Sequence, residues 1–410
     1  MSLNILFLSL LDFDSLNERN IYTDLLSEFK KNGHNISIIS PVELKKKKVT
    51  KLINIEKNCR ILKLRIGNIQ KTNLIEKGIS TIRLESQYIQ GIKKYFSDVS
   101  FDLIIYSTPP VTFQKVVSFV KKRDNAKSYL LLKDIFPQNA VDLNKLKTIS
   151  IIYKYFRYKE KKLYEASDYI GTMSKGNSEY LLKNNPFLND KIIEVNPNSI
   201  RVEEFNKDID NENMRQQLDI PESDTLLLYG GNLGIPQGID FLLEIAEYID
   251  VIQGVSLVIV GSGTEYEKIQ IYLSNMKLKK TQLMKYLPKE NYNNLEKTAD
   301  IGLILLDKRF TIPNIPSRML GYMQAQLPIL AATDINTDLK DLLVDGEYGL
   351  WSQHGDIDGF KNNLSVLLDK DKRNIMGNNG YEYLKNNFDV SKSYKNIIRH
   401  FSEDEDNVRK

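Results

Sequence analysis

The sequence contains few of the residues from which disulfide frameworks and metal sites are built. Its 410 residues include one cysteine, Cys59, and three histidines, His34, His354 and His400, which lie far apart. A single cysteine excludes an internal disulfide and a cysteine-built metal site, and it fits a reducing compartment. We therefore expect a cytoplasmic protein that holds no metal.

Long apolar runs and a strong charge of one sign are also missing. No run approaches the roughly 20 apolar residues that a membrane span needs. The opening stretch MSLNILFLSLLDFD lacks a basic leader and a small-residue cleavage site, so we interpret it as a buried first strand. A net charge of +4 is too small to indicate a nucleic-acid partner. The length and the 41% hydrophobic content predict a soluble protein of two domains.

Short apolar stretches alternate regularly with helix-like stretches along the chain. The short stretches are rich in branched residues, as is typical of parallel strands buried on both faces. They form two series, at residues 4–11, 35–40, 101–107, 127–134, 168–174 and 192–196, and at 225–230, 255–261, 281–286, 300–306 and 328–332. This pattern predicts an α/β protein with two Rossmann-like parallel α/β domains.

The domain boundaries follow from the same pattern. A polar segment from Asp208 to Asp224 separates the two series and looks like a linker. We predict an N-terminal domain at residues 1–205 and a C-terminal domain at 206–388. A C-terminal helix and acidic tail, residues 389–410, can pack back on the N-terminal domain.

Glycines gather where two strands of the second series end. The stretch YGGNLGIPQGIDFLLEIA, residues 229–246, places glycines between a strand and an amphipathic helix, and VGSG at 260–263 repeats the arrangement. Glycines there let backbone N–H groups approach an anion at a helix N-terminus, so a phosphate is the predicted ligand. The alternative is that the glycines only satisfy the turn geometry. The common dinucleotide and NTPase fingerprints are absent.

Several stretches resemble the donor half of glycosyltransferase family 4. They are GGNLGIPQGIDFLLEIA, VGSGTEYEKI, YLPKENYNNLEKTADIGLILL and IPSRMLGYMQAQLPILAATD, while DIFPQNAVDL and NPNSIRVEEF resemble its acceptor half. The resemblance implies the GT-B fold, with the two domains facing each other across a cleft. It also implies a retaining, metal-independent and cofactor-free transfer of a hexosyl or N-acetylhexosaminyl group. The expected donor is a UDP-sugar, and the expected acceptor is a glycan or a lipid-linked glycan in bacterial surface polysaccharide synthesis.

The resemblance also assigns donor-site roles. The glycine turns face the sugar diphosphate, the YLPKENY loop faces the base, and the PSR segment faces the phosphates. Arg318 and the N–H dipoles of Gly231 and Asn232 stabilise charge that grows on the diphosphate. The implied donor-binding residues are Gly230, Gly231, Asn232, Gly234, Gln237, Gly238, Gly261, Gly263, Tyr286, Leu287, Pro316, Ser317, Arg318 and Asp334.

The sequence departs from the family pattern at charged positions. Two cations of the first glycine turn are replaced by Ile235 and Gln237. Two glutamates of the family fall at Pro313 and Gly321. Asp334 or Asp338 can substitute for them, or can cap the helix that starts near Asn336. Lys308 and Arg309 are second-choice cations, with solvated loop charges as the alternative.

Acceptor-side candidates come from the first domain. The loop after the first strand faces the acceptor side in a GT-B protein. Asn198 matches an interdomain motif of the family, although a structural turn explains an asparagine at this position equally well. Asp12 and Asp14 also match the D-x-D pair with which the other glycosyltransferase fold holds manganese, an interpretation we disfavour at the end of a first strand. The candidates are Asp12, Asp14, Glu18, Arg19, Asp134 and Asn198.

Two basic stretches predict a peripheral contact with an anionic membrane at the inner face of the cell membrane. One is Lys45–Lys48, within a basic segment that runs from Glu43 to Lys71. The other is Lys154–Lys162, where cations alternate with aromatic residues. The alternatives are a solvated loop and an ordinary sheet-covering helix.

Two other functions fit the pattern. The missing glutamates and cations leave room for a catalytically silent GT-B protein that binds sugars or scaffolds an assembly complex. A nucleotide-sugar epimerase on the same fold is weaker, because the acid and base residues for that chemistry cannot be placed.

Overall fold

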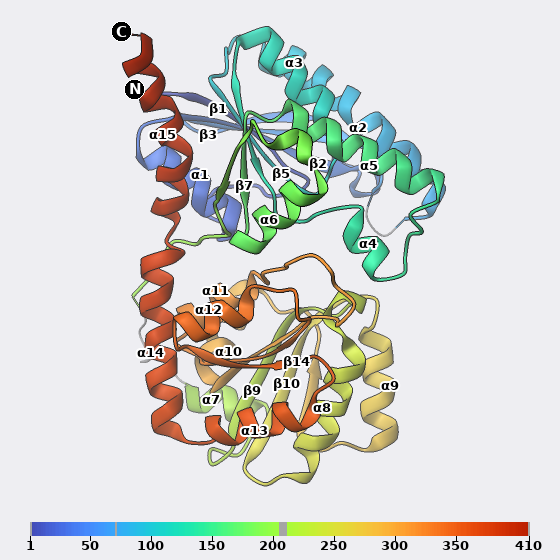
Figure 1. Ribbon diagram of the computed structural model, residues 1–410, viewed down its shortest axis with the longest axis vertical. Coiled ribbons are helices and arrows are strands. Elements are labelled where there is room, and N and C mark those ends of the chain that lie inside the picture. The colour runs from blue at the N-terminus through green and yellow to red at the C-terminus, as the bar shows by residue number, and fades with distance from the viewer. Residues whose placement is uncertain (1, 70–71, 205–210, 409–410) are drawn as a thin grey trace. The chain divides into compact units, whose positions relative to one another are not determined.

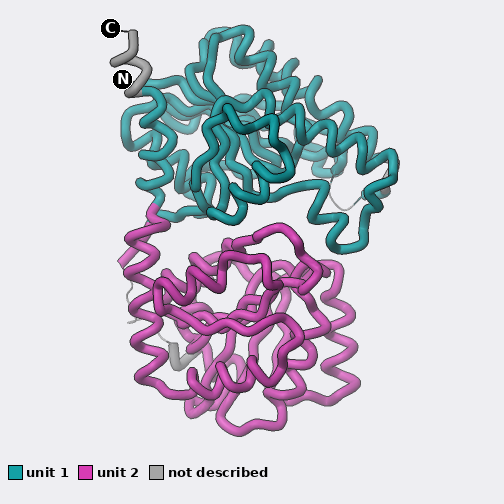
Figure 2. The backbone as a smooth tube through the Cα atoms, in the orientation of Figure 1, with its two compact units in different colours: residues 1–201, 390–410 teal, residues 202–389 magenta. Residues whose placement is uncertain are grey.

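The computed structural model describes residues 2–69, 72–204 and 211–408. The chain forms two compact units (Figure 2): unit 1 is residues 1–201 together with 390–410, and unit 2 is residues 202–389. The chain passes from one unit to the other at 201/202 and again at 389/390. The predicted boundary at 205/206 and the first residues of the predicted linker lie outside the described residues.

Unit 1 is built on an eight-stranded sheet (Figure 1). The strands run in the order β3-β4-β2-β1-β5-β6-β7-β8, and every pair is parallel except β3 with β4. Their bounds are β1 Asn4–Leu8, β2 Asn35–Glu43, β3 Lys51–Glu56, β4 Cys59–Ile66, β5 Leu103–Ser107, β6 Lys127–Leu131, β7 Tyr169–Thr172 and β8 Ile192–Val195.

The antiparallel β3–β4 hairpin corrects one prediction. The basic segment from Glu43 to Lys71 is not a solvated loop along its length, because β4 pairs with β2 and buries Cys59, Ile61 and Leu62. Arg60, Lys63 and Arg65 interrupt the apolar run of β4 and obscured the strand pattern. Of these, Lys63 is buried and paired with carboxylates of the loop after β1.

Helices cover both faces of the unit 1 sheet. One face carries α1 (Ile21–Lys31) and α15 (Val390–Val408), whose apolar side chains share a core with β1 and β5. The helices α2 (Leu74–Tyr95), α3 (Gln114–Asp124) and α5 (Ile151–Ala166) pack against one another on the other side (Figure 1). The remaining helices are α4 (Gln138–Asp142) and α6 (Lys175–Asn184).

The last helix, α15, is held on unit 1 by apolar and polar contacts. Ile397 is fully buried in the core that α15 shares with α1 and β1. The Tyr394 hydroxyl lies 3.1 Å from Nε2 of His34, and the Ser393 and Ser199 hydroxyls are 2.8 Å apart. Residues from the end of the described chain therefore complete the core of its first unit.

Unit 2 is built on a six-stranded sheet in which every pair is parallel. The order is β11-β10-β9-β12-β13-β14. The strands are β9 Thr225–Asn232, β10 Val255–Ser262, β11 Thr281–Met284, β12 Ile301–Leu305, β13 Ile329–Thr333 and β14 Gly349–Gln353. The helices are α7 Asn211–Gln217, α8 Ile239–Val251, α9 Tyr266–Met276, α10 Lys289–Thr298, α11 Arg318–Gln324, α12 Leu339–Asp345, α13 Ile357–Leu367 and α14 Lys370–Asn387.

In each sheet, the first strand has later strands on both sides. β1 lies between β2 and β5, and β9 lies between β10 and β12. The chain reverses its direction of progress across the sheet at these strands, and in open α/β sheets ligands bind outside the carboxyl ends of such strands. The residues that follow β9 and β12 are therefore the first place to look for a site in unit 2.

We predict that Ile397→Ala destabilises unit 1 by about 2–5 kcal/mol, because it leaves a cavity in a packed core. The free energy of unfolding can be measured by denaturant titration, with hydrogen exchange in β1 and β2 to locate the effect. Lys395→Ala on the exposed side of α15 is the control, and it should change the stability by less than about 0.5 kcal/mol. Equal stabilities for the two variants would contradict this packing.

Candidate functional site

The centre of the unit 2 site is the carboxyl end of β9. The strand continues through Asn232, because Gly230, Gly231 and Asn232 pair with Val260, Gly261 and Ser262 of β10. Gly230 and Gly231 were predicted to lie in a turn and are strand residues instead, since the ladder with β10 runs farther than the apolar pattern indicates. Gly231 has φ of 128°, a conformation that favours glycine.

Arg318 lies against this strand end. Its guanidinium carbon lies 4.6 Å from the centroid of the Tyr229 ring and 3.5 Å from the place that a Cβ on Gly231 would occupy. Nη1 is buried and has no hydrogen-bond partner among the residues that the structure describes. A buried guanidinium nitrogen without a partner is costly, and an anion beside Gly231 would satisfy it.

Tyr322 fixes the position of α11, the helix that begins at Arg318. Its hydroxyl accepts a hydrogen bond from the backbone N–H of Gly230 at 3.0 Å and donates to the carbonyl of Leu228 at 3.0 Å. The ring is fully buried. The helix that carries Arg318 is thereby fastened to the strand that carries the glycines.

Two residues of α10 enter the same cluster. Tyr292 ends the YLPKENY stretch that was predicted to face the base, whereas Glu296 was not among the predicted site residues. The Tyr292 hydroxyl lies against Gly230, in space that any side chain there would need. Oε1 of Glu296 lies 2.6 Å from the place that a Cβ on Gly321 would occupy. Burial raises the pKa of the Glu296 carboxyl to about 8, against the opposing effects of Tyr292 and Lys289. The i, i+4 spacing of Tyr292 and Glu296 places them on one face of a helix, but it does not indicate what that face covers.

The second glycine turn is closed by the protein backbone. Side chains on Gly261 and Gly263 would collide with the carbonyl oxygens of Gly231 and Leu233. These two glycines permit close packing of the β9 and β10 ends and do not open a space for a ligand. The structure therefore favours the turn-geometry interpretation here.

The loops after β12 and β14 border the first glycine turn. Arg309 donates to both carboxylate oxygens of Asp307 at 2.8 and 2.6 Å, so this second-choice cation is already paired, while Lys308 is exposed. The His354 ring packs against Gly238, which has φ of 60° where α8 begins. The backbone N–H of Asp307 donates to the Pro236 carbonyl at 2.9 Å.

The remaining predicted donor residues lie around this edge of unit 2. The Asn232 side chain donates to Gln237 at 2.9 Å, and Gly234 has an extended backbone. Asp334 accepts hydrogen bonds from the N–H groups of Asn336 and Thr337 and so closes a turn. The helix α12 begins at Leu339 instead of near Asn336, and its N-cap residue Asp338 makes no side-chain capping bond, so neither aspartate caps it as the alternative expected. Pro316 and Ser317 precede α11, whereas Tyr286, which is exposed, and Leu287 lie between β11 and α10.

In unit 1 the D-x-D carboxylates are engaged by lysines. Lys63 contacts both Asp12 and Asp14, at 2.8 Å from the latter, and Lys46 pairs with Asp12. Over residues 2–69, 72–204 and 211–408, no group of three or more His, Cys, Asp or Glu side chains is arranged to hold a metal ion. The D-x-D pair is therefore part of a charged cluster that ties the loop after β1 to β4.

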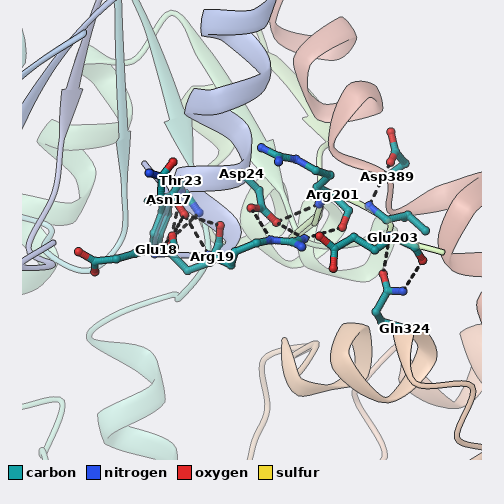
Figure 3. A network of polar contacts seen from close by, with 12 residues as sticks. Asn17, Glu18, Arg19, Thr23, Asp24, Arg201, Glu203, Gln324 and Asp389 are labelled. Carbon is teal, nitrogen blue, oxygen red and sulfur yellow. Dashed lines mark hydrogen bonds and ion pairs between the residues drawn. The ribbon is translucent and has the colours of Figure 1, made fainter. Parts of the chain in front are cut away.

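Figure 3 shows that Arg19 serves a local network in unit 1. Its Nη2 donates to the Arg201 carbonyl at 2.7 Å, and its guanidinium reaches Asp24, which also accepts the N–H of Arg201 at 2.9 Å. Glu18 accepts the N–H of Asp14 at 2.7 Å. The same figure shows Glu203 and Gln324 of unit 2, whose backbone and side-chain groups bond to each other.

Asp134 and Asn198 lie at other positions of unit 1. The backbone N–H groups of Lys133 and Asp134 donate to the Thr108 hydroxyl, just beyond the carboxyl ends of β5 and β6. Burial lowers the pKa of Lys133 to about 7 and raises the pKa of Asp134 to about 6. Asn198 is buried, and its Oδ1 has no hydrogen-bond partner within the described part of the chain.

The basic residues of α5 do not all point outward, which corrects part of the predicted membrane contact. Lys159 is buried and donates to Glu85 of α2 at 2.6 Å. This lysine can be buried because Glu85, 74 residues away in the sequence, supplies a carboxylate partner. Arg157 binds Glu160 and Asn185. In the first stretch, Lys45 pairs with Glu43 and Lys46 pairs with Asp12.

Apolar side chains are exposed at the start of α5 instead. Ile149 and Ile151 are 80% and 85% exposed, and Ile152, Tyr155 and Tyr158 are also exposed. The exposed cations near them are Lys145, Lys147, Lys154 and Lys161. No helix in the described ranges is long and apolar enough to cross a membrane.

Comparison with known proteins finds glycosyltransferases. The model of the family "Glycosyl transferases group 1" matches residues 210–383. The chain is 21% identical over 275 residues to a probable glycosyltransferase, WbjE, of Pseudomonas aeruginosa, and the match covers 67% of each chain.

Two solved structures are similar over nearly the whole chain. WaaG, described as a glycosyltransferase involved in lipopolysaccharide biosynthesis, has a TM-score of 0.67 at 13% identity and covers 96% of this chain and 98% of its own. Anabaena Alr3699/HepE in complex with UDP and glucose has a TM-score of 0.66 at 13% identity and covers 98% and 100%. The two predicted parallel α/β units and the GT-B fold class are thereby confirmed. Residues 210–383 thus match the glycosyl transferases group 1 family within a chain of GT-B fold.

Proposed function

We propose that this protein is a retaining glycosyltransferase of family 4 that uses a nucleotide diphosphate sugar, with a UDP-sugar as the donor. It transfers a hexosyl or N-acetylhexosaminyl group to a glycan or lipid-linked acceptor in bacterial surface polysaccharide synthesis. One observation carries the proposal: the buried, unpartnered Nη1 of Arg318 lies beside Gly231, at the strand end where an α/β sheet binds ligands. The family match and the UDP complex of a structural neighbour support it.

The chemistry needs little beyond positioning and charge stabilisation. The acceptor hydroxyl oxygen forms a bond to the anomeric carbon while the bond from that carbon to the diphosphate oxygen breaks. The hydroxyl proton passes to the leaving phosphate oxygen, so no carboxylate base is required. Arg318 and nearby N–H groups stabilise the charge that grows on the diphosphate. No step of this mechanism uses a metal or another cofactor.

Arg318→Ala should reduce turnover by about 100- to 1,000-fold, because it removes a donor aimed at oxygens whose charge grows in the transition state. Arg318→Lys should recover little, since an ammonium lacks the planar two-point grip of guanidinium. Release of UDP at saturating donor measures both effects. Arg309→Ala is the matched control, since Arg309 is held by Asp307, and near-normal turnover is expected. Equal losses in the Arg309 and Arg318 variants would contradict the assignment.

The nucleotide specificity can be tested without a known acceptor. Thermal unfolding should shift upward with UDP, because a ligand at a hundred times its dissociation constant stabilises by about 2.7 kcal/mol. GDP is the comparison. Binding of a UDP-sugar without nucleotide release would favour a silent sugar-binding protein. An altered sugar on an intact nucleotide would favour an epimerase.

The apolar surface at the start of α5 supports a peripheral location at the inner face of the cell membrane. We name it the α5 surface, and it consists of Ile149, Ile151, Ile152, Tyr155 and Tyr158. Its apolar residues and the exposed lysines around it fit the interface of an anionic bilayer, with the side chains inserted and the cations at the headgroups. The only acidic residue between positions 143 and 164, Glu160, is buried. The acceptor of such an enzyme would be lipid-linked.

Replacing Ile151 and Ile152 together with glutamine should release the protein from vesicles that contain anionic lipid, because the buried apolar area is lost while the charge is unchanged. Sedimentation with phosphatidylcholine–phosphatidylglycerol vesicles is the measurement. Ile271→Gln on α9 is the control, since Ile271 is 60% exposed in unit 2. Parent protein that stays in the supernatant at low salt would argue against this surface.

A further inference from the structure

Lys133 and Asp134 are two charged residues that the proposed mechanism does not use, and they lie where β6 ends. Their backbone N–H groups donate to the Thr108 hydroxyl at 3.1 and 3.2 Å, which fixes this segment beside the end of β5. Both side chains are partly buried. Within residues 2–69, 72–204 and 211–408, neither the ammonium group of Lys133 nor the carboxylate of Asp134 forms a hydrogen bond or an ion pair.

These residues lie at the edge of unit 1 that is suited to a ligand. β1 lies between β2 and β5, and β6 follows β5, so the segments after β1, β5 and β6 meet at one edge of the sheet. In open α/β sheets, ligands bind outside the carboxyl ends of the strands at such a point. The carboxylates of the loop after β1, Asp12 and Asp14, are already paired with lysines. Lys133 is therefore a cation at this edge that an anionic ligand would pair.

Phe136 connects this edge to the α5 surface. Its ring meets the ring of Phe156 on α5 edge-on, with 5.0 Å between the two centroids. Phe156 in turn meets the ring of Tyr155, which belongs to the α5 surface, at 5.2 Å. Ile135, between Asp134 and Phe136, is buried and anchors the segment. The charged residues at the end of β6 and the apolar residues proposed to enter the bilayer are therefore parts of one packed region.

We propose that Lys133 binds a phosphate group of the acceptor, and that the lipid chain of the same acceptor lies against the α5 surface. The acceptor would then be a lipid phosphate or diphosphate that carries the sugar to be extended. The inference rests on the proposed function and deepens it, because it gives the acceptor a chemical class and names a residue that selects it. A lysine suits this task, since its ammonium group pairs with phosphate oxygens as a point charge.

The charge on Lys133 supports a phosphate as the ligand. A partly buried ammonium group without a partner is costly, and burial lowers the pKa of Lys133 to about 7. Lys63 and Lys159, which are buried, each have a carboxylate partner within 2.8 Å. A phosphate beside Lys133 would supply the charge that carboxylates supply to those two lysines.

A phosphate near Lys133 can come from two sources, the acceptor or the headgroups of an anionic bilayer. The exposed lysines around the α5 surface suit headgroups, because they stand in water beside the apolar residues that would insert. Lys133 is less exposed and lies at the sheet edge, so it fits the head of a single lipid that enters the protein. The two sources predict different effects of a Lys133 substitution.

Farnesyl diphosphate and farnesol, which differ only in the diphosphate, test the inference in solution without vesicles. Isothermal titration calorimetry should show that the parent protein binds the diphosphate about tenfold more tightly, the scale of one hydrogen bond to a charged group. Lys133→Gln should bind the two ligands with equal affinity. Lys145→Gln, which changes an exposed lysine near the α5 surface, should keep the preference. Replacing Ile151 and Ile152 together with glutamine should weaken the binding of both ligands alike.

A parent protein without a preference for the diphosphate, or a Lys133→Gln variant that keeps the preference, would overturn the inference. Sedimentation with phosphatidylcholine–phosphatidylglycerol vesicles distinguishes the two sources of phosphate. Lys133→Gln should sediment with these vesicles as the parent does. Its release from them would show that Lys133 binds headgroups and would overturn the acceptor assignment.

Two further measurements separate the inference from the fold and from the proposed donor. The melting temperature of Lys133→Gln should be no lower than that of the parent, because the change removes a charge without a partner. A marked fall would show that Lys133 supports the fold and would overturn the inference. The thermal shift with UDP should be the same in the parent and in Lys133→Gln. Preferential binding of farnesyl diphosphate by a protein that binds neither UDP nor GDP would support this lipid site while overturning the proposed donor.

Discussion

The geometry of unit 2 depends on one buried hydroxyl group, that of Tyr322. It accepts the N–H of Gly230 and donates to the carbonyl of Leu228, and thereby fastens α11 to the end of β9. An unsatisfied N–H or carbonyl at this depth would cost about 1–3 kcal/mol, so the contact is hard to replace. Because Arg318 and Gly321 lie on α11, the position of the guanidinium and the space occupied by Glu296 both follow from it.

The cluster has an uncommon composition for a site that would hold a diphosphate. It contains one guanidinium group, three tyrosines and a carboxyl group. The centroid of the Tyr229 ring lies 4.6 Å from the Arg318 guanidinium carbon without neutralising its charge, and Nη1 of Arg318 is buried. Low local polarity strengthens every remaining electrostatic interaction, so a single cation can do more than it would at an exposed loop. This offers a physical reason why the proposed diphosphate site could work without the two turn cations that Ile235 and Gln237 replace.

The sequence predicted the fold in large part, and the failures have identifiable causes. Most strands were found because parallel strands buried on both faces are continuous apolar runs, as in β5 and β12. β14 was missed because GLWSQ carries polar residues. β4 was missed because Arg60, Lys63 and Arg65 break its apolar run, and the partners of Lys63 lie in another loop.

The site was predicted less completely than the fold. The strand end and Arg318 could be chosen from glycine spacing and residue type. Tyr292 and Glu296 could not be chosen in this way. They fit there because Gly230 and Gly321, on elements distant in sequence, have no side chains to fill the space. Lys159 is a second example. The sequence predicts a solvated lysine, because it does not show that Glu85 of α2 lies beside it in the fold.

The return of α15 to unit 1 bears on how the chain folds during synthesis. All of unit 2 is made before residues 390–401 leave the ribosome, so unit 2 can fold while the α1 face of unit 1 still lacks Ile397 and Tyr394. Domains generally fold as units during translation, and exposed apolar surface on an incomplete unit invites aggregation. The N-terminal half of the protein, although it is synthesised first, is therefore the half whose core is completed last.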